Sequence, residues 1–538
     1  MIKKIALNIL ASLIVVSSFA QQIEIKQPRL VVNIVVSGMR STDIERYLNN
    51  YSLNGLRMLY EQGLHYSNCQ YSYQQTTKHI SLSTLSTGAQ PSTHGIVGDS
   101  WFDYVTNEEL NLVTNKDIRN LEYTPPTGGY SSHNLLVPTL SDQLIADSPQ
   151  SKAVTVALNP TSAILINGKS GLPFWFDETT CKWTSSESYI KELPTWVSYY
   201  NQTEADIDKV KSDWNLTLMP DLYLNSRYSS TPKVGTFHKA VEIERKEEFR
   251  VRYAKYYQQI SQSPIGNDIV AAFAKLAIAS LKLGADEQTD LLNICFDVSR
   301  NIVEKYGPES IEAEDMYYKI DKSIAGIIRF LNSEVGDSGE VIYIVTSDSG
   351  TSPTVPQDGY RFNSRQLEVI LNGFLSARHG NEKWVLGCHN GSIYLNHNVI
   401  YQKGMSLAEI QNEAATFTLQ LQGVSHAMTS TALSSSYYGS GYAQKIQTGF
   451  YPRRSGDVVL NLMPNWIFTD SERLSMSGSM YKYDREVPLI IYTGNTPAKT
   501  FTGHVDPISI APTIAEMMGI SAPAASEGES LKEFIFTK

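Results

Sequence analysis

Cysteine and positive charge are both scarce in this sequence. The 538 residues include four cysteines, at positions 69, 181, 295 and 388, and the formal net charge is -10. The cysteines are spaced too widely for a zinc ribbon or a redox pair, and Cys295, inside an apolar run, is expected to be a buried free thiol. The negative charge argues against non-specific binding to a nucleic-acid backbone.

Long apolar runs are absent beyond the N-terminus. Lys3 and Lys4 precede an apolar stretch that ends in small residues before Gln21, which is the pattern of a secretory signal peptide cleaved after Ala20. No later run of ~20 apolar residues follows, so we expect no transmembrane helix in the mature chain. The sequence therefore predicts a signal peptide at 1–20 and an exported protein, periplasmic, associated with the outer membrane or extracellular.

Strand-like and helix-like segments alternate along residues 21–538. Runs rich in β-branched residues, typical of strands covered on both faces, occur at 29–37, 152–158, 291–299, 341–347 and 487–494. Between them, 267–284 (ending in a glycine cap) and 312–332 have the apolar spacing of amphipathic helices. We therefore predict an α/β domain with a mainly parallel central sheet between helix layers, whose ligands bind beyond the carboxyl ends of the strands.

Two stretches break this alternation. The first, at about 173–264, is rich in Trp, Tyr, Pro and Asn, and the second, at about 352–454, mixes loops with short apolar runs. We interpret both as cap-like insertions into the domain at 21–538 that cover the strand ends.

Six blocks at the predicted strand ends carry a resemblance to a known family. They are "LVVNIVVSGMR", "STLSTGAQPSTHGIVGDSWFD", "KYGPESIEAEDMYYKID", "VIYIVTSDSG", "YKYDREVPLIIYTG" and "ISIAPTIAEMMGI". In order and spacing the chain resembles the alkaline phosphatase superfamily, most closely its monomeric, phosphate-irrepressible alkaline phosphatases and more distantly the nucleotide pyrophosphatases/phosphodiesterases. The resemblance covers nearly the whole mature chain and implies the alkaline phosphatase-like fold.

The resemblance also implies a two-zinc site, but the matching positions have changed. Active members of the superfamily bind zinc through three aspartates and three histidines, and a threonine or serine attacks phosphorus. The nucleophile position holds Lys78, with Thr76 and Thr77 as the nearest hydroxyls. The six ligand positions hold Ser37, Arg300, Glu304, Asp348, Ser349 and Ser477. Only Asp348 keeps the identity that the family has at its position.

The positions that contact phosphate in the family are changed as well. Asp99 stands where the family has an asparagine, and Asn159 and Thr161 stand where its lysine and arginine follow the third strand. A carboxylate at Asp99 would repel a phosphoryl dianion. His79 lies outside the ligand positions.

Loss of two metal ions would leave buried carboxylates unpaired, which is costly. The sequence places the cations Lys78 and Arg300 among these positions. We therefore expect Lys78 to pair with Asp348 and Arg300 with Glu304, so that a network of charged side chains replaces zinc.

Three functions follow from these changes. The leading prediction is a protein of the cell envelope that is not an enzyme: a pseudophosphatase without zinc, cofactor or catalytic residues, which binds an envelope protein or a glycan and no nucleic acid. The second is a metal-dependent phosphomonoesterase or phosphodiesterase with an altered site that uses Asp348, Glu304 and a hydroxyl such as that of Thr77. The third is a metal-free phosphate or sulfate binder that uses Lys78 and Arg300.

Overall fold

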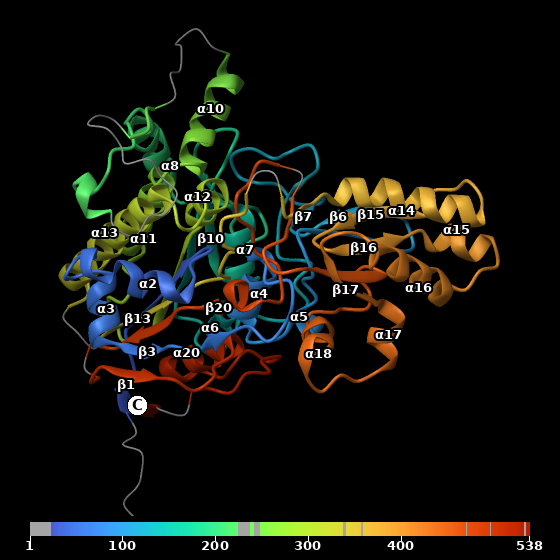
Figure 1. The fold of residues 1–538 in the computed structure, drawn as a ribbon. Coiled ribbons are helices and arrows are strands. Elements are labelled where there is room, and N and C mark those ends of the chain that lie inside the picture. Colours follow the sequence, from blue (N-terminus) through green and yellow to red (C-terminus); the bar gives the residue numbers. More distant parts are fainter. Residues whose placement is uncertain are drawn as a thin grey trace, which may run out of the picture.

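A nine-stranded sheet forms the middle of the molecule (Figure 1). This computed structural model describes residues 23–223, 237–240, 248–336, 340–356, 359–469, 471–494, 496–531 and 534–537, so the predicted signal peptide at 1–20 lies outside the described residues. In sheet order the strands are β11 (Trp183–Thr184), β10 (Leu172–Phe176), β9 (Ala153–Ala157), β12 (Asp290–Phe296), β2 (Leu30–Val36), β13 (Val341–Thr346), β21 (Leu489–Tyr492), β3 (Leu64–Tyr66) and β22 (Lys499–Phe501).

The five strands from β10 to β13 in this order are mutually parallel. The strand β21 pairs antiparallel with both β13 and β3, and β11 pairs antiparallel with β10. At the edge of the molecule, β1 (Ile23–Lys26) pairs with the C-terminal strand β23 (Phe534–Thr537). The predicted α/β class with a mainly parallel central sheet is confirmed.

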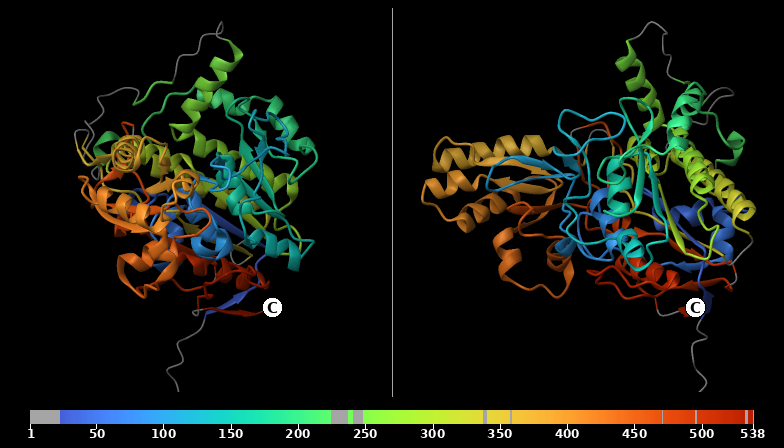
Figure 2. Two further views of the ribbon diagram at one scale, coloured as in Figure 1. Left: turned by 90° about the vertical axis from the view of Figure 1, so that its right-hand side faces the viewer. Right: turned by 180° about the vertical axis from the view of Figure 1, so that it is seen from behind.

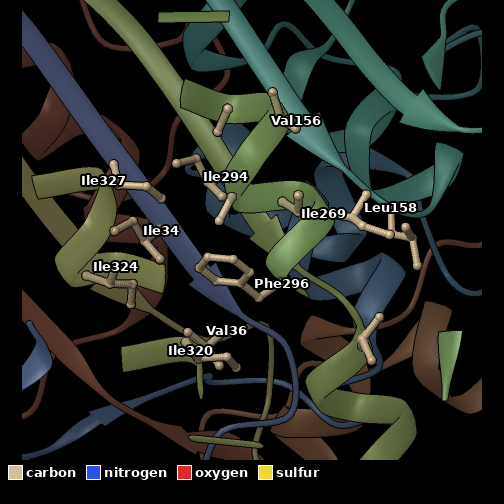
Figure 3. Close-up of a cluster of buried hydrophobic side chains, with 14 of the residues drawn as sticks. Ile34, Val36, Val156, Leu158, Ile269, Ile294, Phe296, Ile320, Ile324 and Ile327 are labelled. Atoms are coloured by element: carbon tan, nitrogen blue, oxygen red, sulfur yellow. The ribbon is translucent and has the colours of Figure 1, made fainter. Parts of the chain in front are cut away.

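Helices cover both faces of the sheet because its central strands are apolar on both sides. In β2, Leu30, Val32, Ile34 and Val36 belong to one buried cluster, and Val31 and Val35 belong to another. Figure 3 shows the first cluster, in which Ile34 and Phe296 of neighbouring strands lie close to Ile269 and Ile324 of the covering helices. The helices of this face include α11 (Ile265–Leu281), α12 (Val298–Tyr306) and α13 (Ile311–Glu334), and those of the other face include α4 (Lys78–Thr87), α6 (Leu140–Asp147), α7 (Pro160–Asn167) and α20 (Ile510–Met518).

Three boundaries differ from the sequence prediction. The predicted strand at 291–299 ends at Phe296, because α12 begins at Val298. The helix predicted to end on a glycine cap has Lys282 at its cap in the left-handed conformation, with φ of 54°, and Gly284 follows it. The strand β10 belongs to the central sheet, so the sheet reaches into the segment from 173 that the sequence set apart as an insertion.

A smaller unit projects from one side of the main body, as Figure 1 and the rear view in Figure 2 both show. Its four-stranded antiparallel sheet has a separate hydrophobic core, which includes Leu371, Trp384 and Ile410. The unit comprises α14 (Ser364–His379), β15 (Val385–His389), β16 (Ser392–Leu395), α15 (His397–Gln402), α16 (Leu407–Thr418), β17 (Val424–Thr429) and β18 (Val458–Leu462). It contains most of the second predicted insertion and, through β18, extends beyond residue 454.

No single helix of the described residues is long and apolar enough to cross a bilayer. Two consecutive helices, α10 (Phe249–Ser261) and α11, have the length and apolar composition of a membrane span only when taken together, and they meet at an angle of 89°. All four cysteines are buried and unpaired, as the sequence predicts for Cys295.

Candidate functional site

The carboxyl ends of the parallel strands bring most of the predicted site residues together. Ser37 follows β2 directly, and Asp348 and Ser349 follow β13. Arg300 and Glu304 lie one turn apart on α12, the helix that starts just after β12. Because parallel strands end at one edge of the sheet, residues hundreds of positions apart in the chain become neighbours there.

Arg300 lies at the centre of these residues and is almost completely buried. Its guanidinium donates to Ser37 Oγ at 3.0 Å, to Ser349 Oγ at 2.7 Å and to Asp348 Oδ1 at 2.8 Å. It also donates to Ser477 Oγ at 2.5 Å, and Glu304 Oε1 lies 3.5 Å from Nη1. Burial by itself lowers the pKa of this guanidinium, but Asp348 and Glu304 outweigh burial and raise the pKa, so Arg300 is charged.

The predicted pairing of Lys78 with Asp348 is wrong. Lys78 Nζ lies 3.6 Å from Asp297 Oδ1, at the start of α12, whereas Arg300 is the cation that pairs with Asp348. The predicted pairing of Arg300 with Glu304 is confirmed, and Arg473 Nη1 also contacts Glu304, at 2.7 Å. The fully buried carboxylate of Asp348 is thus compensated by a residue of α12 and not by one of α4.

A pocket of about 790 Å³ opens above this cluster, between the strand ends and the smaller unit. Its walls include Lys78, Asp99, Asn159, Arg300, Glu304 and Ser477 from the predicted positions. The smaller unit adds Arg365, Glu368, Leu386, His389 and Asn390, and the short strands and loops beside it add Phe102, Glu109, Phe468 and Arg473. Residues of the segment at 352–454 thus form part of the pocket wall.

Thr77 and His79 flank Lys78 in the pocket wall. Thr77 precedes α4 at the usual capping position, yet its side chain caps nothing, and its Oγ1 is buried without a hydrogen-bond partner among the described residues. Burial and the neighbouring Lys78 lower the pKa of His79, so its imidazole is neutral at pH 7. The unsatisfied Thr77 hydroxyl indicates a functional residue, and the sequence alone could not show that it lacks a partner among the described residues.

The other predicted positions have individual roles. Asp99 Oδ1 accepts a hydrogen bond from Asn390 Nδ2 at 2.9 Å, which ties the pocket wall to the smaller unit. Asn159 caps α7, because its Oδ1 accepts from the Thr161 amide at 2.9 Å. Thr161 lies on the first turn of α7 and does not line the pocket, in contrast to Asn159.

The residues at the strand ends do not fit a pair of zinc ions. No group of three or more His, Cys, Asp or Glu side chains within the described ranges is arranged to hold a metal. Asp348 and Glu304 both face the Arg300 guanidinium, and the remaining positions offer hydroxyl groups. Protein zinc sites use thiolate, imidazole and carboxylate ligands, and a buried cation at their centre opposes a second cation.

Comparison with known proteins places this geometry in a family. Residues 31–485 match the model of the family described as type I phosphodiesterase / nucleotide pyrophosphatase. The chain is 27% identical over 518 residues to "Alkaline phosphatase PhoV" of Synechococcus elongatus, covering 95% of this chain and 94% of that protein. It is 25% identical over 520 residues to "Alkaline phosphatase PafA" of Elizabethkingia meningoseptica, covering 95% of both.

The crystal structure of wild-type alkaline phosphatase PafA has the same fold, with a TM-score of 0.86 at 24% identity over 95% of this chain and 99% of that one. These relatives show that the prediction of a protein that is not an enzyme is wrong, because proteins matched along almost the whole chain are alkaline phosphatases. The family itself is zinc-dependent, so the departure lies in the local donor set. The chain belongs to the type I phosphodiesterase / nucleotide pyrophosphatase family of the alkaline phosphatase superfamily.

Proposed function

We propose that the chain hydrolyses phosphate esters in the pocket above Arg300. The observation that carries the proposal is the pair formed by Thr77 and Lys78. Within the described part of the chain, the Thr77 hydroxyl has no hydrogen-bond partner and Lys78 has one long ion pair, and the two residues are neighbours in the wall of a large pocket. Groups with unmet bonding capacity are what a substrate can use. The alkaline phosphatases among the relatives support the reaction class.

In this proposal, Thr77 Oγ1 attacks phosphorus, the bond to the ester oxygen breaks, and the Thr77 proton passes through solvent to the leaving oxygen. Water then cleaves the phosphothreonine and regenerates the hydroxyl. Lys78 Nζ and the free amides at the start of α4 stabilise the charge on the phosphoryl oxygens, since a helix N-terminus favours anions. The imidazole of His79 lines the same wall, but burial and Lys78 lower its pKa to about 3, so it is too weak a base to take the hydroxyl proton. Because the donor set does not fit zinc, we infer that these steps use side chains of the chain itself.

The charge around the pocket favours esters with a single negative charge. Lys78, Arg300, Arg365 and Arg473 are its cations. Six carboxylates oppose them: Asp99, Glu109, Asp297, Glu304, Asp348 and Glu368. An excess of carboxylates repels a dianion more strongly than a monoanion. We therefore expect phosphate diesters to be better substrates than phosphate monoesters.

Release of p-nitrophenol tests the proposal. Wild-type protein should hydrolyse bis(p-nitrophenyl) phosphate faster than p-nitrophenyl phosphate, and Thr77→Val should lower kcat at least about 100-fold. The matched control is Thr76→Val, since the Thr76 hydroxyl is buried and donates to the Asp484 carbonyl at 3.3 Å. Saturable binding of phosphate or vanadate without turnover by the wild type would overturn the proposal and favour an anion-binding protein.

We also infer that the protein acts outside the cytoplasm. The inference rests on the signal-like sequence at 1–20, which lies outside the described residues. Detection of the protein in separated periplasmic, membrane and culture-medium fractions of the producing cells tests it. An envelope protein or glycan as a binding partner stays a prediction.

A further inference from the structure

We propose that the Arg300 guanidinium is the resident cation of this site: it takes the place of a metal ion, joins the strand ends and does not bind substrate. This inference deepens the account of the site described above but does not depend on turnover. It rests on the contacts of one buried side chain and on the chemistry of its partners.

The partners of Arg300 come from separate parts of the fold. Ser37 follows β2, Asp348 and Ser349 follow β13, and Ser477 lies on the loop before α19 (Lys482–Arg485). Arg300 itself extends from α12 after β12. A single side chain therefore connects three neighbouring elements of the central sheet to the loop that closes the pocket, as a multidentate metal ion does.

The hydrogen-bond capacity of the guanidinium is filled. Arginine offers five N–H donors in a fixed fork. Four hydrogen bonds, to the three serines and Asp348, and the ion pair with Glu304 account for five contacts. Since each N–H faces one of these partners, Arg300 is less available to a ligand than the pocket's other cations, among them Lys78, whose ion pair with Asp297 is 3.6 Å long.

The acceptors are organised around the guanidinium as well. Asp348 accepts from Arg300 and the Gly38 amide through Oδ1, at 2.8 and 3.0 Å, and from Ser37 Oγ through Oδ2, at 2.5 Å. Gly38 has a φ of +79°, and a Cβ atom there would lie 3.3 Å from Arg300 Cα. The close approach of α12 to the β2 loop thus requires glycine and positions Arg300 over Asp348.

Zinc binding would require this arrangement to be dismantled. A zinc ion near Asp348 would lie beside a buried positive charge, and the ligands available after displacement of Arg300 would be two carboxylates and three hydroxyls. Serine hydroxyls are not zinc ligands in protein sites. A guanidinium that stays charged over the whole working pH range gives the same charge compensation without a metal.

Metal content and thermal unfolding of the full chain test this inference without substrate. After incubation with excess zinc and desalting, mass spectrometry should find well under one zinc ion per chain. The unfolding temperature should be the same in zinc and in EDTA. One or two tightly held zinc ions, or an unfolding temperature that zinc raises and EDTA lowers, would overturn the inference even if phosphate esters are hydrolysed.

Variants of the two arginines that contact Glu304 give the second arm. Arg300→Met should lower the unfolding temperature by about 5 °C or more, because it leaves Asp348 buried without its cation. Arg300→Lys keeps a charge but not the planar fork of N–H donors, so its unfolding temperature should lie between those of the wild type and Arg300→Met. This variant provides the test if Arg300→Met does not fold. Arg473→Ala, the matched control with a half-exposed side chain, should change the temperature by about 1 °C or less. Equal effects of Arg300→Met and Arg473→Ala would contradict the structural role.

Discussion

The two sides of the pocket differ in how far their polar groups are satisfied. Around Arg300, two carboxylates, three hydroxyls and a guanidinium are bonded to one another. Around Lys78, the Thr77 hydroxyl has no partner among the described residues and the ammonium group has one ion pair of 3.6 Å. The Arg300 side is built on the ends of β12, β2 and β13, whereas the Lys78 side is built on the start of α4.

This difference separates structure from function within one site. Buried polar groups are normally satisfied, and the exceptions need a reason. The closed Arg300 side compensates charge in the interior, where an unpaired ion would be costly. The open side at Lys78 has capacity left for a ligand, and that is where we place the reaction.

Removal of the charge on Asp348 should have the largest effect on stability. Asp348→Asn leaves Arg300 with Glu304 as its one contacting carboxylate and disturbs the acceptors of Ser37 and Gly38. We expect a loss of about 3–5 kcal/mol in the free energy of unfolding, measured by urea denaturation. Asp99→Asn, in the same pocket but exposed, should cost less than about 1 kcal/mol. Similar urea midpoints for Asp348→Asn and Asp99→Asn would show that the contacts around Arg300 do not stabilise the fold more than those of an exposed pocket residue.

The buried carboxyl of Asp484 allows a second test, through pH, of how an incompletely satisfied polar group affects stability. This buried carboxyl accepts from the Ser479 amide at 2.7 Å, but its Oδ1 has no partner in the described part of the chain, and burial raises its pKa from 3.8 to about 7. A raised pKa stabilises the fold at low pH, and that stability is lost as pH rises from the unfolded pKa near 4 through the folded pKa near 7.

Asp484→Asn should remove this dependence. Between pH 4 and pH 7.5, the wild type should lose up to about 4 kcal/mol relative to the variant, because about three pKa units separate the folded and unfolded carboxyl. Urea denaturation across this pH range measures the difference. Parallel curves of unfolding free energy against pH for the two proteins would mean that the pKa of Asp484 is the same in the folded and unfolded states.

The sequence predicted the strand ends and the residues gathered there, because both follow from periodicity and from the order of recognisable blocks. The pairing of those residues was harder. Lys78 and Asp297 are far apart in the chain, and which cation reaches which carboxylate depends on the direction of α4 and α12 and on side-chain length. Arg300 was correctly assigned to Glu304, one helical turn away, because that spacing is local.

The parts of the site without a regular period could not be predicted. β10, "LPFWF", has no β-branched residue and contains a proline, so it resembled an insertion although it is a sheet strand. Phe468, in the two-residue strand β19 (Ile467–Phe468), and Arg473 come from short or irregular segments that only the packed structure brings to the pocket. The catalytic interpretation was wrong for a related reason: missing zinc ligands were taken as missing chemistry, whereas the unmet Thr77 hydroxyl became visible only in the structure.

Loss of the Lys78 charge should affect turnover and leave the fold intact. Lys78→Met removes the ion pair of the buried Asp297, but this carboxylate still accepts from the Asn159 amide and Ser162 Oγ, so the stability cost should be smaller than that of Asp348→Asn. The kcat for bis(p-nitrophenyl) phosphate should fall about 100-fold, the usual effect of removing one group that stabilises transition-state charge. Lys78→Arg, which keeps the charge, should recover part of this loss. A large fall in stability with unchanged turnover would mean that Lys78 has a structural role like that of Arg300 and no role in turnover.

The smallest effect should come from Arg473, which belongs to both sides. It contacts Glu304 at 2.7 Å, yet half of its side chain is exposed, at 51%. Exposed ion pairs contribute little to stability, and an exposed cation at a pocket mouth acts mainly on the approach of an anion. Arg473→Ala should therefore raise KM about threefold with kcat unchanged, and the increase should shrink as salt is added. Steady-state kinetics at low and high ionic strength measure both quantities. A fall in kcat that salt does not alter would place Arg473 in contact with the reacting group, and the open side would then extend across the pocket to Glu304.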